Sequence, residues 1–461
     1  MHNSRERKRT NSMLPIQILP VRLNWNLNRL TWLMLACLLG CRDSQPIEGV
    51  VVGASMAPTL LPDHWEIACV DCRYSFPLDV SPTDNQSTKL VCPNCGCPLN
   101  GSEGVVFRPA QRLEIHPIKD LARWDIAAFQ VPGGSTIGIK RVVGLPAEVL
   151  QFRGGDLFAD QQLLRKPWPI QIALRIPIFD SSYQPANSAP NRWRPRTVKS
   201  NWSTDQDVWK YEIAKDILNS ENQITSNTTG TRPAPPTEVR EPGWEWLVYH
   251  HWRCCAHRGS RDDEFPIEDI DTFNSSLGRN LNPMDDIFLE LKCDVAANAQ
   301  LGWRFHRGLE CFEFRIDTAC HQLLVATDSS AENPAQFRTV VLPSHLFPLR
   351  TIEFSSFDAQ LMVRINGVEV LAESLEPVYQ PGVAPVLEIG AALGFVRLEQ
   401  IRLWRDIYYL DVTSTDQTLS AETGRYLLLG DNVPVSIDSR QWRNGGIPRK
   451  SMIGTVRSLQ D

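Results

Sequence analysis

Short runs in which apolar and polar residues alternate recur along residues 286–404, and they limit the possible folds more than any other feature. Side chains of a β-strand point to opposite faces in alternation, so this period of two predicts half-buried strands. Asn366-Gly367 lies between two such runs and is typical of a two-residue hairpin turn. The runs are Asp286–Cys293, Glu310–Ile316, Gln322–Ala326, Thr351–Ser355, Gln360–Ile365, Gly367–Leu371 and Val396–Trp404. They predict an antiparallel β-sandwich, which we assign to residues 175–412.

The rest of the chain also favours strands. Residues 47–53 form a short apolar run that leads into Ser55, and residues 125–131 and 136–143 flank the turn-forming Pro132-Gly133-Gly134. A second hairpin is expected over residues 150–158, and residues 181–240 are rich in Ser, Pro, Asn and Thr and look loop-like. No helical period persists. We therefore expect a mainly β protein.

Composition excludes some classes of protein. With 42% hydrophobic and 22% charged residues, the chain has the balance of a globular protein. Its formal net charge of −6 argues against a nucleic-acid partner, which would select a basic surface.

The N-terminus predicts a membrane anchor. Several basic residues precede the apolar run 30–40, which is short for a spanning helix of about 20 residues but fits the core of a secretory signal. Leu38-Leu39-Gly40-Cys41 also looks like a lipid-attachment site at Cys41. An uncleaved single-pass anchor, a lipid anchor and a released protein all stay open. In either anchored case the basic residues stay inside and the chain after residue 43 faces outward.

Three separated motifs carry the candidate chemistry, namely Gly53–Leu60, Ile139–Pro146 and Gly430–Arg440. Ser55 follows a strand beside Gly53, which leaves its hydroxyl accessible as a nucleophile requires. None of the nine His residues lies in these motifs, so another base is needed. Lys140 lies in an apolar strand, where burial would lower the pKa of its amine and let it act as that base.

Taken singly, each motif has a simpler interpretation. A Ser near Gly and Pro is usually a turn residue, a strand Lys usually reaches solvent, and Asp438 with Arg440 could be a structural pair in a polar loop. All three motifs in this order, however, closely resemble the type I signal peptidase family. The resemblance implies a β-rich catalytic domain that uses no catalytic cofactor and cleaves signal peptides from exported preproteins after small residues, as in Ala-x-Ala.

The resemblance also implies roles for individual residues. Ser55 would be the nucleophile, Lys140 the general base, and Ser436 a hydroxyl that orients the Lys140 amine. Asp438 and Arg440 would support the loop around Ser436, and Gly53 and Met56 would support Ser55. Leu427–Leu429 and the strand before Ser55 would help line the cleft.

The sequence departs from the family pattern at several positions. Gly53 stands where many members have a Ser that donates to the oxyanion, so the oxyanion hole would depend mainly on the Ser55 backbone N–H. Trp124 and Ala147 each replace a usual Gly. These positions lie outside the Ser–Lys dyad and leave its assignment standing.

Two CxxC pairs predict a structural metal site. Cys69, Cys72, Cys92 and Cys95 have the spacing of a four-cysteine zinc ribbon, and four thiolates suit tetrahedral zinc. Two disulfides are the alternative, and Cys97 could compete as a ligand. Elsewhere, Cys293, Cys311 and Cys320 could include one bridge. His250 and His251 resemble a metal cluster, although such runs are more often loop residues.

The sandwich resembles lectin-like jelly-roll domains of the laminin-G and concanavalin type, on its strand pattern and on residues 400–409. The resemblance implies glycan binding; a packing or partner-docking module is the alternative. Trp303, His306, Trp404 and Tyr408 could stack on sugars, although aromatic residues in a sandwich are more often core.

Together these patterns divide the chain into six segments: an anchor (1–46), a first catalytic piece (47–63), the zinc ribbon (64–104), a second catalytic piece (105–174), the sandwich (175–412) and a third catalytic piece (413–461). The leading hypothesis is an active signal peptidase. A self-cleaving repressor-type protease is disfavoured because it would need a DNA-binding head. The non-enzyme alternative is a membrane-tethered protein that binds glycans or partners and has a silent peptidase frame.

Overall fold

The computed structural model describes most of the chain after residue 44. The described residues are 45–80, 90–99, 104–118, 120–186, 190–205, 208–212, 243–254, 264–274, 279–327, 336–379, 386–410, 418–442 and 445–459. The apolar run 30–40 and Cys41, on which the anchor prediction depends, lie outside them. Within these ranges no helix has the length and apolar character needed to span a membrane.

The chain forms two compact units. The first contains residues up to Trp65 together with Val106–Leu163 and Tyr409–Asp461, and the second contains Glu66–Val105 and Leu164–Tyr408. The two CxxC pairs therefore belong to the same unit as the predicted sandwich.

An antiparallel sheet forms the centre of the first unit. Its strands, in spatial order, are β1 (Ile47–Val50), β7 (Arg112–Pro117), β31 (Met452–Leu459), β8 (Ile126–Gln130), β9 (Ile137–Gly144), β29 (Arg425–Leu429) and β30 (Ile447–Pro448). A smaller sheet contains β12 (Gln162–Leu163), β11 (Asp156–Ala159), β10 (Val149–Arg153) and β28 (Thr418–Ser420). The first unit also contains two short 3-10 helices, η1 (Ala54–Met56) and η5 (Arg449–Ser451). Segments from three parts of the sequence thus share one sheet.

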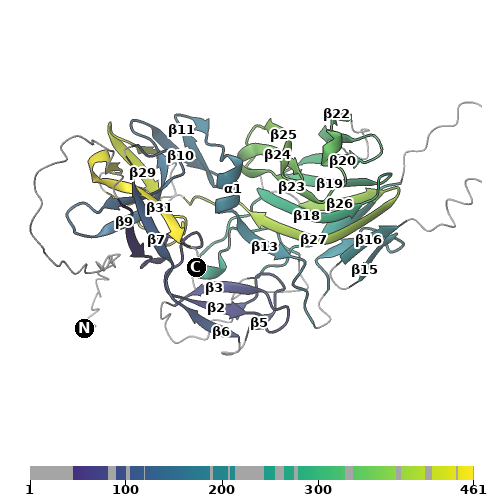
Figure 1. Ribbon diagram of the computed structural model, residues 1–461, viewed down its shortest axis with the longest axis horizontal. Helices are drawn as coiled ribbons and strands as arrows, with labels where there is room; N and C mark the ends of the chain where they lie inside the picture. Colours follow the sequence, from purple (N-terminus) through teal and green to yellow (C-terminus); the bar gives the residue numbers. More distant parts are fainter. Residues whose placement is uncertain are drawn as a thin grey trace, which may run out of the picture. The chain divides into compact units, whose positions relative to one another are not determined.

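Two antiparallel sheets form most of the second unit (Figure 1). One contains β15 (Trp202–Asp205), β16 (Val208–Glu212), β27 (Phe395–Arg405), β18 (Ile287–Val295), β23 (Thr351–Ser355), β24 (Gln360–Ile365) and β25 (Val368–Ser374), with β13 (Ile176–Asp180) paired to β27. The other contains β14 (Trp193–Pro195), β17 (Glu245–Tyr249), β26 (Leu387–Ala392), β19 (Gln300–Arg307), β20 (Glu310–Asp317), β21 (Gln322–Thr327) and β22 (Arg338–Val341). The 3-10 helices η2 (Thr272–Asn274), η3 (Ser344–Leu346) and η4 (Phe357–Ala359) lie in their connections.

The two sheets pack face to face around an aromatic core. Phe354, on β23 of the first sheet, contacts the rings of Trp303, Phe305 and Phe314 from the second. All four side chains are fully buried, as are the alternating apolar residues around them. The predicted mainly β fold with an antiparallel sandwich is confirmed.

The hairpin at Asn366-Gly367 joins β24 to β25, as predicted. Both turn residues have positive φ, 49° and 79°, as a two-residue hairpin turn requires. The loop-like assignment of residues 181–240 was wrong for β14, β15 and β16. Trp193, Trp202 and Trp209 in these strands are buried, so a few aromatic side chains secure strands in an otherwise polar sequence.

The CxxC segment forms a small domain docked on the sandwich. It contains β3 (Ser75–Asp79), β2 (His64–Ala68), β6 (Val105–Arg108), β4 (Leu90–Val91) and β5 (Pro98–Leu99). Asn94 Nδ2 donates to the carbonyls of Asp180 at 3.2 Å and Tyr183 at 2.8 Å, and the Asp180 N–H donates back to Asn94 Oδ1 at 2.7 Å. These hydrogen bonds fix the CxxC segment to the end of β13.

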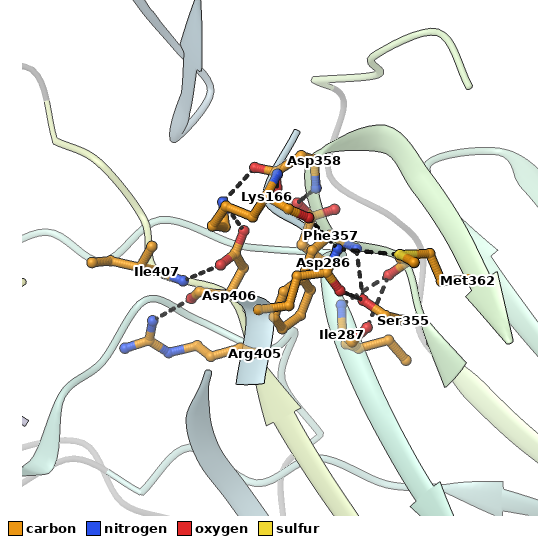
Figure 2. Close-up of polar contacts among 12 residues, drawn as sticks. Lys166, Asp286, Ile287, Ser355, Phe357, Asp358, Met362, Arg405, Asp406 and Ile407 are labelled. Atoms are coloured by element: carbon orange, nitrogen blue, oxygen red, sulfur yellow. Dashed lines mark hydrogen bonds and ion pairs between the residues drawn. The ribbon is translucent and has the colours of Figure 1, made fainter. Parts of the chain in front are cut away.

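A buried charge cluster secures the residues through which the chain enters and leaves the sandwich (Figure 2). Lys166, just before helix α1 (Trp168–Leu174), pairs with Asp358 and lies 2.8 Å from Asp406 Oδ2, just after β27. All three side chains are almost completely buried. Burial and the nearby Asp358 raise the pKa of Asp406 to about 7, against the opposing effect of Lys166. Because a buried charge is tolerated only when it is paired, this cluster holds the two connections together.

Candidate active site

Ser55 lies in a tight turn anchored by buried apolar side chains. It is the middle residue of η1, and its own side chain is half-buried. Met56 and Leu60 are buried in an apolar cluster with residues of β7, β8 and β9. Gly53 has extended backbone angles, φ −117° and ψ 153°, which any residue can adopt. The turn therefore holds the Ser55 hydroxyl in a fixed position above this cluster.

Lys140 lies on β9, a central strand of the sheet. β9 pairs with β8 on one side and β29 on the other, and its residues from Gly138 to Gly144 are all buried. The Lys140 side chain is 6% exposed. Its Nζ lies 2.5 Å from Ser55 Oγ, within hydrogen-bonding distance. The fold thus joins two motifs that are 85 residues apart.

Burial determines the charge state of the Lys140 amine. Desolvation lowers the pKa of Lys140 to about 8, because an ammonium loses hydration in this setting. Asp438 and Asp431 oppose this shift, and Arg440 adds to it. With this pKa about a tenth of the amine is uncharged at pH 7 and about half at pH 8, and the uncharged form can accept a proton.

Gly430 lets the third motif reach the serine. A Cβ at this position would lie 2.2 Å from Ser436 Oγ and 2.3 Å from the Ser55 carbonyl oxygen, so a larger residue would collide with both. Asn432 then joins the segments, since its backbone N–H donates to the Ser55 carbonyl at 3.1 Å and its Nδ2 to that of Ala54 at 2.9 Å.

Asp438 and Arg440 form a buried ion pair that supports the loop. Arg440 Nε and Nη2 donate to the Asp438 carboxylate at 2.8 Å and 2.7 Å. The same carboxylate accepts the Gly430 N–H at 3.0 Å. Arg440 Nη2 also donates to the Val433 carbonyl at 3.0 Å. The pair therefore fixes both ends of the loop.

Ser436 is buried beside Ser55, but its Oγ makes no hydrogen bond to the described part of the chain. The structure places this hydroxyl close to the site and shows no bond from it to Lys140. Leu427–Leu429 were expected to line a cleft, and this is wrong. Their side chains are fully buried in β29, so they pack within the protein and not on an open surface.

Sequence reasoning assigned no role to Arg141, Asp431 or Asn432. Arg141 and Asp431 form a buried two-point ion pair, with distances of 2.8 Å from Nε and 2.6 Å from Nη2. An Arg inside an apolar strand requires a buried acidic partner, and an Asp in the third motif was the available one. That charge requirement was the signal that could have identified the pair.

Trp124 and Ala147 have the backbone conformation that favours glycine. Their φ angles are 75° and 74°, in the left-handed region. Both positions were noted as departures from a usual Gly. Trp124 contributes a buried side chain and accepts a hydrogen bond from Arg141 Nη1 at 2.7 Å, whereas Ala147 contributes only a methyl group.

The four CxxC sulfurs form one buried cluster. All lie within 4.8 Å of one another, and the short contacts cross between the pairs, 3.7 Å for Cys69–Cys95 and 3.6 Å for Cys72–Cys92. Tetrahedral zinc with bonds of about 2.3 Å requires sulfurs about 3.8 Å apart, so the cluster fits such an ion. None of the four forms a disulfide, which excludes the disulfide alternative in this structure. Cys97 is outside the cluster and contacts the Pro98 carbonyl.

Other residues singled out in the sequence have structural surroundings. Trp303 and Trp404 are buried, so they cannot stack on a sugar. Cys293, Cys311 and Cys320 form no disulfide, and the described residues contain no group of three or more metal-ligating side chains besides the four cysteines. His251 contacts Tyr249 and Arg192 instead.

Comparison with known families decides the family. A model described as "Signal peptidase, peptidase S26" matches residues 23–192 and 360–459, together more than half of the chain. The chain belongs to the signal peptidase family, peptidase S26. The matched ranges contain Ser55, Lys140 and the whole Gly430–Arg440 loop of this signal peptidase family member. No curated protein matches the sequence.

Several solved structures resemble parts of this family member. The galectin LEC-6 of Caenorhabditis elegans matches at 14% identity and TM-score 0.20, over 26% of this chain and 81% of that one. The carbohydrate binding module CBM66 of Bacillus subtilis matches at 7% identity and TM-score 0.24, over 47% of this chain and 94% of that one. Sheep galectin-11 matches at 12% identity and TM-score 0.21, over 26% of this chain and 90% of that one. At TM-scores this low the matches carry no argument about fold or function.

Replacing Ala147 with Gly is expected to stabilise the protein by about 1 kcal/mol, because the left-handed backbone costs a non-glycine residue about that much. Chemical denaturation of Ala147→Gly measures the change. The matched control is Ala110→Gly, at a position without positive φ, where no gain is expected. Equal effects at both positions would contradict the strain assignment.

Proposed function

We propose that this protein is a signal peptidase, an endopeptidase that cleaves signal peptides from exported preproteins with Ser55 as nucleophile and Lys140 as general base. The observation that carries the proposal is the 2.5 Å contact between Lys140 Nζ and Ser55 Oγ. The almost complete burial of the amine supports it, since a lysine can act as a base only when uncharged.

In the proposed reaction, neutral Lys140 accepts the Ser55 hydroxyl proton while Oγ attacks the scissile carbonyl carbon. The Ser55 backbone N–H stabilises the oxyanion that develops, and Gly53 has no hydroxyl to assist it. As the C–N bond breaks, the Lys140 ammonium gives its proton to the leaving amine. Lys140 then takes a proton from a water molecule whose oxygen attacks the acyl carbon. As the C–Oγ bond of the acyl-Ser55 ester breaks, Lys140 gives that proton to Ser55 Oγ, which releases the second product and restores the dyad.

The proposed substrate is an extended signal-peptide end with small residues before the cleaved bond. Exposed apolar side chains adjacent in sequence to the site residues support an apolar substrate. Val52 lies three residues before Ser55 and is 45% exposed, and Val435 and Ile437 flank Ser436 at 38% and 44%. We also propose that an N-terminal anchor holds the catalytic unit at the outer side of the membrane, where exported preproteins emerge.

For the four-cysteine cluster we propose a structural zinc ion bound by Cys69, Cys72, Cys92 and Cys95. Four thiolates leave no open coordination position, so the ion would stabilise the fold and take no part in the cleavage. The ion is expected to hold the hairpins β2–β3 and β4–β5 together, because this segment has few other core residues.

Ser55→Ala and Lys140→Met are each expected to abolish cleavage of a preprotein peptide ending its signal in Ala-x-Ala, because one removes the nucleophile and the other the base. The assay follows product formation by mass spectrometry in purified full-length protein. Lys450→Met is the control, since this lysine is exposed. Wild-type activity in Ser55→Ala would disprove the proposal.

The free energy of unfolding of Lys140→Met shows whether a loss of activity comes from the missing base or from unfolding. The folded pKa of about 8 lies below the unfolded value, so the unfolded state binds more protons between about pH 8 and 10.5. Burying this amine therefore costs stability at pH 7, at most about 3 kcal/mol, and less as the pH rises. Lys140→Met should be more stable than wild type at pH 7, and the advantage should shrink toward pH 10.

Activity is expected to rise with pH through an apparent pKa of about 8, because only the neutral Lys140 amine can accept the Ser55 proton. The dependence of kcat/KM on pH between 6 and 9.5 measures it. A rate that is constant over this range would contradict a lysine base in the free enzyme.

The full-length protein is expected to contain one zinc ion per chain by elemental analysis. Cys72→Ser should lose the ion, because it removes one of four ligands, and should make the segment around it sensitive to proteolysis. Cys97→Ser is the matched control and should retain the ion. Equal zinc content in both variants would contradict the proposed ligand set.

A further inference from the structure

The outer face of one sandwich sheet has a polar layer that the proposed peptidase does not use. Leu301, Trp303 and Phe305 on β19 point into the core. Strand alternation therefore turns Gly302, Arg304 and His306 to the opposite face. The same alternation turns Glu313 and Arg315 on β20, Glu388 and Gly390 on β26, and Trp246 on β17 outward.

Two indole rings lie on this face where the strands carry glycine. A Cβ on Gly390 would come within 2.6 Å of the Trp246 ring, and one on Gly302 within 2.9 Å of the Trp244 ring. The two indoles are stacked, with centroids 5.4 Å apart and planes at 23°. The glycines thus let both rings approach the backbone closely.

Two arginines cover these rings in fixed orientations. The Arg304 guanidinium lies 4.0 Å above Trp246, and that of Arg315 lies 4.9 Å from Trp244. One carboxylate, Glu313, accepts from both, at 2.9 Å from Arg304 Nε and 2.5 Å from Arg315 Nε. Both guanidiniums are therefore held by their Nε atoms and by the rings beneath them.

The terminal nitrogens of these two arginines are left without hydrogen-bond acceptors in the described part of the protein. Arg304 Nη1 lies 3.8 Å from Glu388, beyond hydrogen-bonding distance, and no acceptor contacts the Nη atoms of Arg315. The side chains are 21% and 16% exposed, so the free donors reach solvent. Two neighbouring guanidinium groups with free terminal donors are suited to an anion with planar oxygens.

Charge in this layer favours an anionic ligand. The carboxylates of Glu313 and Glu388 are fully buried, and they face Arg196, Arg304, Arg315 and His306. Burial by itself would lower the pKa of His306, but Cys311 and Glu388 raise it to about 9, so the imidazole is charged at neutral pH. Four basic side chains, Arg196, Arg304, Arg315 and His306, thus lie around two buried carboxylates within a chain of net charge −6.

Stability alone is a poor reason for this arrangement. Buried ion pairs often stabilise no more than apolar residues of similar size, and an outer sheet face has no need of two buried carboxylates. Here the carboxylates orient the arginines, which reduces the entropy that a ligand would lose on binding.

We propose that the outer face around Trp244, Trp246, Arg304 and Arg315 is a binding site for a carboxylate-bearing saccharide. The free guanidinium donors would take the carboxylate. Arg315 lies over the rings of both Trp244 and Phe337, at 4.9 Å and 4.3 Å, and the parts of these two partly exposed side chains that Arg315 leaves uncovered would contact the C–H surface of the sugar ring. The site is on a sheet face and not on a sheet edge, where an extended peptide would add as a strand.

The test is calorimetric titration of the full-length protein with polygalacturonate oligomers. Binding is expected, weaker at higher salt, and at least tenfold weaker for the same oligomers after methyl esterification, which keeps the sugar and removes the charge. Equal binding of acid and ester would overturn the proposal, as would no binding of either. Equal binding of a polyglutamate peptide would show a general anion surface and would also overturn it.

Variants locate the site. Arg304→Gln and Arg315→Gln are each expected to weaken binding of the acid at least tenfold, and Arg315→Lys less so, since it keeps the charge and loses the fork. Arg350→Gln, at an exposed arginine paired with Asp294, is the control and should bind as wild type does. Unchanged affinity in Arg304→Gln and Arg315→Gln would overturn the proposal. If either fails to fold, the comparison of acid with ester in wild-type protein still decides it.

Discussion

The site depends on lowering the pKa of one amine while two carboxylates lie nearby. Desolvation lowers the pKa of Lys140, and Asp431 and Asp438 act against it. Each of these carboxylates has its own arginine, Arg141 for Asp431 and Arg440 for Asp438. Arg440 also lowers the pKa of Lys140, and desolvation, the largest effect, outweighs the two carboxylates. The two ion pairs thus shape the loop without restoring the lysine's ordinary pKa.

Hydrogen bonds to backbone atoms bring the three motifs together. Asn432 binds the carbonyls of Ala54 and Ser55, and Asp438 binds the N–H of Gly430. Gly430 is the one position in this loop at which a side chain would collide with both Ser55 and Ser436. These contacts position the turn around Ser55 relative to β9, and the position of Ser55 relative to β9 determines the contact with Lys140.

The second unit is braced internally at the places where the chain enters and leaves it. Lys166 and Asp406, at the two ends of the sandwich segment, form a buried cluster with Asp358 of η4, and Asn94 fixes the CxxC segment to β13. Two long insertions can therefore be folded as one body. A peptidase whose motifs are separated in sequence can tolerate such insertions, because their loop-closure cost grows only slowly with length.

Sequence alone determined the fold class, the hairpins and the residues that could do the chemistry. These are local patterns. Alternation of apolar and polar residues predicts strands such as β18 and β27, Asn366-Gly367 predicts a turn, and the CxxC spacing predicts a compact four-sulfur cluster. Only the tertiary structure decided which side chains are buried: Leu427–Leu429 beneath the surface, Trp303 in the core, and the aromatic strands β14 to β16 that a polar composition concealed. It also paired Arg141 with Asp431 and placed Lys140 against Ser55, since contacts across 290 and 85 residues depend on strand order, which no local pattern records.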